Sequence, residues 1–136
     1  MKHLPTVAGI LLGLLFIMSS VVVLFHLVKM PPPPDGTPAA MFMGAFIPTG
    51  YMTFVKVLEL TGGILVASPR SRNFGLLILG PIIVNILAFH VFITKEDGLL
   101  DPMLIIIVLL ALAISSEDER TFLGANEDAD AAHGNR

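Results

Sequence analysis

Residues 74–94 read FGLLILGPIIVNILAFHVFIT, and this stretch decides the fold class. At about 1.5 Å rise per residue, its roughly 21 residues span the ~30 Å hydrocarbon core of a bilayer. Three residues interrupt the apolar run: Pro81, Asn85 and His90. Because lipid offers no hydrogen-bond partner to an amide or an imidazole, we expect Asn85 and His90 to face other helices or a wet cavity. The stretch therefore predicts a transmembrane helix that needs partner helices.

The composition of the whole chain indicates a membrane protein. Of its 136 residues, 54% are hydrophobic and 14% are charged, whereas a soluble domain has about 25% charged residues. There is no basic cluster of the kind that binds nucleic acid. The chain has no cysteine, which excludes disulfides, thiol catalysis and cysteine-ligated metal. Any redox role must therefore use a bound cofactor or a partner.

Further apolar segments complete the predicted fold, an all-α membrane protein built as a bundle of four transmembrane helices. We expect these helices over about 7–28, 51–67, 74–94 and 99–116. The segment 39–47 is apolar but too short to span a bilayer. It predicts a short interfacial or re-entrant helix between the first and second crossings.

Charge sets the domain boundary and the orientation. Residues 1–116 form the predicted transmembrane domain, and the polar, acidic residues 117–136 predict a disordered tail. Four crossings put both termini on one side of the membrane. Arg70 and Arg72 lie in the short loop before the third crossing, so the positive-inside rule places that loop and both termini in the cytoplasm.

With that orientation, several polar groups fall at one depth. Lys56 and Glu59 are three residues apart and opposite in charge, so they are neighbours on one helix. A lone ion is costly inside the membrane, and we expect the pair to face the bundle. With His26, Asn85 and His90 they occupy a layer roughly 3–14 Å below the outer boundary, at about 1.5 Å per residue. One shared layer predicts one polar site.

More ordinary interpretations are also open. His26 can be an interfacial residue, Lys56 can snorkel to the outer surface, and Asn85 can satisfy the backbone carbonyl that the proline leaves free. A metal site of His26, His90 and Glu59 is chemically conceivable. So is a b-type haem held by the two histidines. Neither site has a specific spacing motif in the sequence.

Three motifs resemble the DoxX family of small bacterial four-helix membrane proteins. They are FMGAFIPTGYM at 42–52, VKVLELTGGILVASPRSRNFG at 55–75 and GPIIVNILAFHVF at 80–92. Positions of the family pattern are matched by Glu59, Gly62, Gly63, Pro81, Asn85 and His90. The resemblance implies a four-helix bundle of the bacterial inner membrane. It also implies a link to thiosulfate:quinone oxidoreduction or to membrane oxidoreductase complexes. A chain without cysteine, however, does not fit an enzyme that oxidises thiosulfate on its own.

The first predicted function is that of a membrane redox component that binds a quinone. Glu59 and His90 would be its catalytic residues, because a carboxylate and an imidazole can each take up and release protons. Lys56, Asn85 and His26 would bind the ligand beside them. A membrane or peripheral redox protein is the partner that this function implies.

The short segment would complete such a site from outside. Its residues Met41, Phe42 and Phe46 would roof the pocket with an apolar, adaptable lining. The second predicted function is a non-catalytic membrane scaffold or assembly partner, in which the polar layer holds the helices together. A homo-oligomer of the chain is compatible with both predicted functions.

Overall fold

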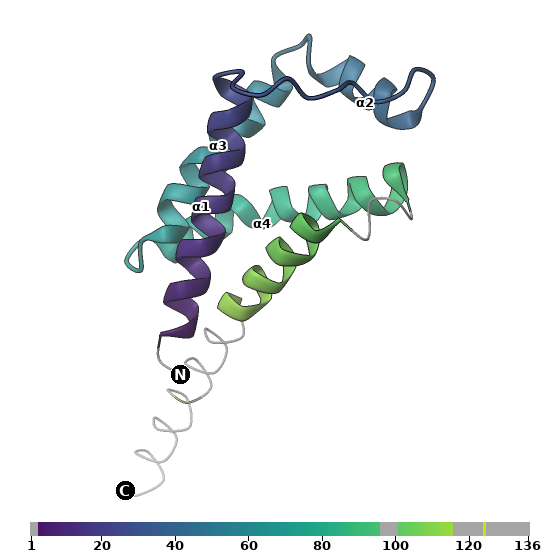
Figure 1. The fold of residues 1–136 in the computed structure, drawn as a ribbon. Helices are drawn as coiled ribbons and strands as arrows, with labels where there is room; N and C mark the ends of the chain where they lie inside the picture. Colours follow the sequence, from purple (N-terminus) through teal and green to yellow (C-terminus); the bar gives the residue numbers. More distant parts are fainter. Residues whose placement is uncertain (1–2, 96–100, 116–123, 125–136) are drawn as a thin grey trace, which may run out of the picture.

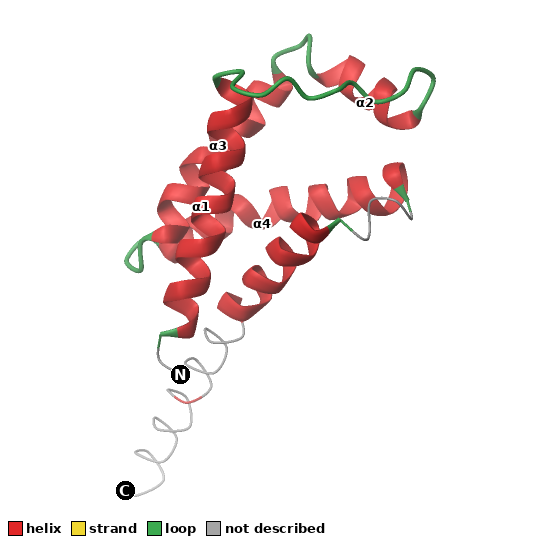
Figure 2. Ribbon diagram, viewed as in Figure 1, coloured by secondary structure: helices red, strands yellow, loops and turns green. Residues whose placement is uncertain are grey.

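The chain folds into helices joined by short loops. The structure is a computed structural model, and it describes residues 3–95, 101–115 and 124 (Figure 1). The described residues contain helix and loop but no strand (Figure 2). The helices are α1 (Leu4–Leu24), α2 (Pro38–Phe46), α3 (Tyr51–Ala67), α4 (Arg72–Phe89), the π-helical turn η1 (His90–Thr94) and a last helix, Pro102–Ser115.

The predicted helix positions are largely confirmed. α3 has the predicted bounds, and α2 lies where the short helix was expected. α1 differs, because it starts at Leu4 and ends at Leu24 instead of running to residue 28. Its end is set by His26, whose backbone φ of +54° leaves the helical region. The four prolines that follow Met30 then keep the chain extended.

Side-chain caps fix the start of two helices. The Thr37 hydroxyl oxygen accepts a hydrogen bond from the backbone N–H of Ala40 at 3.2 Å. The carboxylate of Asp101 accepts one from the N–H of Met103 at 2.8 Å. Both caps stand directly before a proline at the first helical position, where a missing N–H costs nothing.

Glycines bring α1 and α3 into direct backbone contact. A Cβ atom built on Gly13 would lie 2.5 Å from the carbonyl oxygen of Gly63 and 2.8 Å from the Cβ of Ala67. A Cβ on Gly63 would in turn lie 3.0 Å from the carbonyl oxygen of Gly13. Larger residues cannot occupy these positions at this spacing. Small residues therefore mediate the close packing of α1 against α3.

The same glycine-rich end of α3 also receives α4. A Cβ on Gly62 would lie 2.7 Å from the Leu79 side chain, and one on Gly75 would lie 2.8 Å from the Cα of Val66. Leu79 and Val66 are completely buried in this contact region. The first half of α4 is therefore held against α3, and its second half continues through η1 toward α2 (Figure 1).

The helices do not form a bundle of near-parallel rods. α1 and α3 lie side by side, whereas α4 runs across that pair in the view of Figure 1. The last helix contributes Leu104, Ile107 and Ile114 to the buried apolar residues. The arrangement confirms an all-helical fold of membrane type and leaves the four-helix bundle unconfirmed.

Among the described residues, fewer helices than expected qualify as membrane crossings by length and composition. α1 and the run Arg72–Thr94 are each long and apolar enough to cross a bilayer. α2 and α3 qualify only as one broken span or re-entrant pair, bent by 85°. The described part of the chain thus has two candidate crossings, or three with the bent pair, and Pro102–Ser115 is a shorter apolar helix. The predicted tail, residues 117–136, lies outside the described residues except for Gly124.

Candidate functional site

The centre of the candidate site is an ion pair within α3. The ammonium nitrogen of Lys56 lies 2.6 Å from Oε2 of Glu59, and the two side chains are only 14% and 4% exposed. The pair forms because residues three apart on a helix lie one turn above each other. The predicted pairing is confirmed, and Glu59 is a carboxylate held almost entirely inside the protein.

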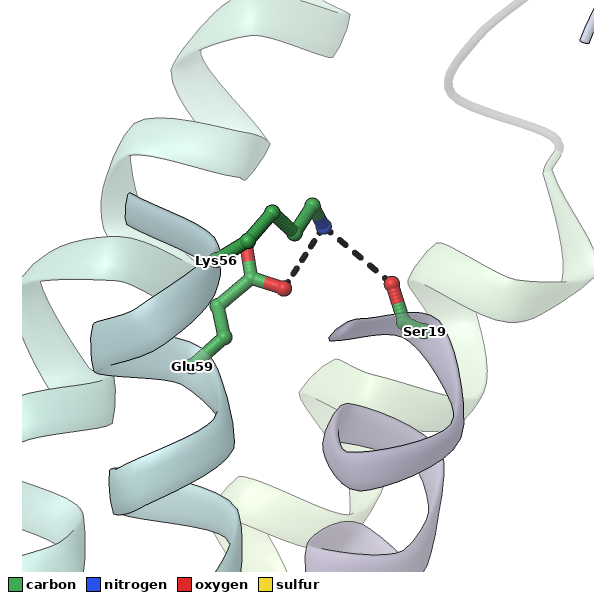
Figure 3. Close-up of polar contacts among 3 residues, drawn as sticks. All are labelled: Ser19, Lys56 and Glu59. Carbon is green, nitrogen blue, oxygen red and sulfur yellow. Dashed lines mark hydrogen bonds and ion pairs between the residues drawn. The ribbon is translucent and has the colours of Figure 1, made fainter. Parts of the chain in front are cut away.

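Lys56 also reaches across to α1. Its ammonium donates a second hydrogen bond to the hydroxyl oxygen of Ser19 at 3.2 Å (Figure 3). The side chain therefore points toward the neighbouring helix instead of snorkelling to the outer surface. Because the ammonium bridges Glu59 and Ser19, these three residues form one hydrogen-bonded cluster between α1 and α3.

A half-open, mainly apolar cavity of about 360 Å³ lies beside this cluster. Three polar residues, Ser19, Lys56 and Glu59, contribute to its wall. The rest of the lining is apolar and comes from α1, the following loop, α4 and the last helix: Leu15, Phe16, Met18, Val22, Met30, Ile86, Met103 and Ile107. A mainly apolar cavity with a few convergent polar groups is typical of small-ligand sites, which have volumes of about 300–1,000 Å³.

The residues of the cavity wall favour a mainly apolar ligand with a hydrogen-bond acceptor. Met18, Met30 and Met103 supply three flexible, polarisable thioethers, which adapt to irregular shapes. Lys56 supplies N–H donors, and Glu59 can accept a hydrogen bond or, when protonated, donate one. The site can therefore bind a carbonyl oxygen and exchange a proton beside it.

His90 does not line this cavity. Its ring is half-buried, and the Nδ1–H donates to the carbonyl oxygen of Ile86 at 2.7 Å, one turn back along the chain. That bond leaves Nε2 as the free ring nitrogen. Ile86 lines the cavity, so His90 lies one helical turn beyond the wall, at the start of η1.

Asn85 and His26 also lie apart from the cavity. Both are exposed, and neither side chain has a hydrogen bond to any described residue. The expectation that Asn85 faces other helices or a wet cavity stays a prediction. The buried face of α4 carries Gly75 and Leu79, and at 3.6 residues per turn Asn85 lies roughly 80–120° around the helix from them.

The predicted roof of the site is an aromatic cluster elsewhere. The ring of Phe42 lies 4.5 Å from that of Phe46 and 5.0 Å from that of Phe89. Phe46 in turn lies 4.6 Å from Tyr51. These rings attach α2 to the end of α4, and Met41 is exposed to the outside. Met41, Phe42 and Phe46 therefore do not cover the Lys56–Glu59 cavity.

The structure gives no support to a metal site. Within residues 3–95, 101–115 and 124, no group of three or more histidines or carboxylates is close enough to hold an ion. His26, His90 and Glu59 in particular are not brought together. The two histidines lie at the ends of α1 and α4, outside the cavity.

Ser19 and the methionines Met18, Met30 and Met103 were not predicted from the sequence to line the site. A serine inside an apolar helix commonly hydrogen-bonds to the backbone of its own helix. Its presence in the sequence therefore does not indicate a contact with another helix. Its position opposite Lys56 depends on how α1 packs against α3. The methionines come from three separated segments, and their convergence likewise follows only from the fold.

No known protein family, curated protein or solved structure matches the chain. Membership of the DoxX family therefore stays a prediction. Function is inferred from the geometry of the cavity.

Proposed function

We propose that the chain is a membrane redox component that binds a quinone in the cavity around Lys56, Glu59 and Ser19. The observation that carries this proposal is the largely buried ion pair, 2.6 Å between its atoms, in the wall of a half-open apolar cavity of about 360 Å³. A quinone head group is flat and apolar and presents carbonyl oxygens, which match an ammonium donor and a thioether-rich wall. The ligand is membrane-soluble, as a site within apolar helices requires.

The two charged residues have distinct roles in this proposal. Lys56 donates a hydrogen bond to a carbonyl oxygen of the quinone and orients the ring. Glu59 holds Lys56 in place and carries a proton to or from the same oxygen. Reduction to the quinol consumes two electrons and two protons, and the electrons come from an electron-donating protein that docks on the chain. Ser19 fixes the ammonium from the side of α1.

Titration of the purified protein with a short-chain quinone tests the proposal. In mild detergent, we expect saturable binding to the wild type by calorimetry and loss of binding in Glu59→Gln. Ser19→Ala leaves the ion pair intact, and we expect several-fold weaker binding without a loss of thermal stability. Absence of binding to a folded wild type rejects the quinone function.

A matched serine controls for the loss of a hydroxyl. Ser115 lies on the last helix, is exposed and donates to the carbonyl oxygen of Ala111 at 3.0 Å. We expect Ser115→Ala to bind quinone like the wild type. Leu109→Ala on the same helix is a second control, since Leu109 is exposed and does not line the cavity.

We further propose that the protein is of the DoxX type, with four crossings and both termini in the cytoplasm of a bacterial inner membrane. The apolar runs and the position of Arg70 and Arg72 support this topology. Asp35 and Pro69 are exposed residues of the first and second loops. Single cysteines there should label from opposite sides of intact cells, with Asp35→Cys labelled from outside. Labelling of Pro69→Cys from outside rejects the orientation.

A non-catalytic scaffold is the second candidate function. The observation that favours it is that Lys56 and Glu59 satisfy each other's charge, so the cluster needs no ligand to be stable. A scaffold would co-purify with one protein at a fixed ratio and contain no quinone. The redox component would instead retain quinone in the absence of any partner.

A further inference from the structure

One side of α4 and η1 is apolar and exposed, with the amide of Asn85 within it. This α4 stripe consists of Phe74, Leu77, Pro81, Val84 and Asn85 of α4 and Phe92 of η1. Spacings of three, four and seven residues place these positions on one side of the helix. Leu77, Val84 and Phe92 are 73%, 66% and 76% exposed. The opposite side of the helix carries the residues that pack against α3.

Asn85 lies near the middle of the length of this stripe and has no partner among the described residues. Its side chain is exposed and has no hydrogen bond to any described residue. It is about 13 Å from Thr94 and about 20 Å from Arg72 along the helix, at 1.5 Å per residue. A short side chain cannot reach either end, and acyl chains offer an amide neither a donor nor an acceptor.

We infer that the α4 stripe binds the same stripe of a second copy of this chain, and that the two Asn85 amides hydrogen-bond to each other. A carboxamide carries both donor and acceptor, so it is complementary to itself. In a symmetric dimer each surface patch meets its own copy. A two-fold axis near Asn85 brings residue 85 of one copy to residue 85 of the other, whichever way the helices run.

The packing of α4 in the single chain is consistent with a second copy there. In the most apolar 18-residue stretch of Arg72–Thr94, only 11% is buried inside the protein, against 33% for the corresponding stretch of α1. Lipid can cover the exposed apolar side chains of the α4 stripe. The unpaired amide of Asn85 among them requires a hydrogen-bonding partner from a protein. The inference does not depend on the quinone site, because the α4 stripe and the cavity share no residue.

Single-cysteine cross-linking tests the interface, and the absence of native cysteine makes each bond specific. Val84 lies on the α4 stripe and is 66% exposed, whereas Leu109 is 60% exposed on the last helix, outside the stripe. In proteoliposomes of fixed lipid-to-protein ratio, we expect oxidation to give covalent dimers of Val84→Cys and few or none of Leu109→Cys. Equal cross-linking of the two variants, or none of Val84→Cys, overturns the proposal.

Substitution of Asn85 tests the role of the amide. In the Val84→Cys background, we expect Asn85→Val to weaken dimerisation about tenfold, since one or two interhelical hydrogen bonds are lost. Asn85→Gln keeps the amide and should retain most of the dimer. Asn85 is exposed in the single chain, so neither change disturbs the protomer, and unchanged thermal unfolding of each variant checks this. An undiminished dimer in Asn85→Val overturns the amide pairing.

Discussion

The ammonium of Lys56 lies 2.6 Å from the carboxylate of Glu59, and the Glu59 side chain is almost completely withdrawn from the surface. A pair of this kind is stable only while both charges are present. Removal of one partner leaves an uncompensated charge among apolar side chains.

Lys56→Met and Glu59→Gln are therefore expected to be coupled. Each single change should destabilise the protein by a few kcal/mol, and the double change should recover part of the loss because no lone charge remains. Thermal unfolding in detergent measures the coupling through a double-mutant cycle. Strictly additive losses would show that the two residues do not interact.

The contact between Gly13 and Gly63 predicts a second effect on stability. Gly13→Ala places a methyl group 2.5 Å from the carbonyl oxygen of Gly63. We expect α1 and α3 to move apart at a cost of about 1–3 kcal/mol. Gly80→Ala is the matched control, since no atom lies within 4 Å of a Cβ there. If the two variants unfold at the same temperature, the helices do not pack through these glycines.

The aromatic cluster predicts how α2 is held. Phe42→Ala removes the ring that contacts Phe89 at 5.0 Å, and an aromatic pair contributes about 0.5–1.5 kcal/mol. Hydrogen exchange of the α2 amides should therefore accelerate by up to about tenfold. Met41→Ala, an exposed change on the same helix, should leave the exchange rate unaltered. Equal exchange in both variants would mean that α2 is held by other contacts.

Local features of the fold could be predicted from the sequence. Gly50 precedes α3, and Ser68 and Pro69 follow it, so punctuating residues marked both of its ends. The end of α1 was not marked in this way. The apolar run continues to Val28, and only the backbone of His26 ends the helix four residues earlier.

The candidate site could be predicted only in part. Lys56 and Glu59 were found because both lie on one helix, where spacing fixes distance. Asn85 and His90 were grouped with them by depth, which assumes helices that run parallel to one another. α4 instead crosses the α1–α3 pair (Figure 1), so equal depth does not bring these residues together. The contribution of Ser19 depends on that packing too, and no local pattern encodes it.

Photolabelling with a quinone that carries a light-activated group tests the central claim most directly. Bound in the cavity, the probe should label peptides that contain Met18, Met103 and Ile107, and unlabelled quinone should compete. Glu59→Gln should lose this labelling while Leu109→Ala keeps it. Labelling confined to Phe42 and Phe46 of α2, or labelling that quinone does not compete, would contradict a quinone site at Lys56 and Glu59.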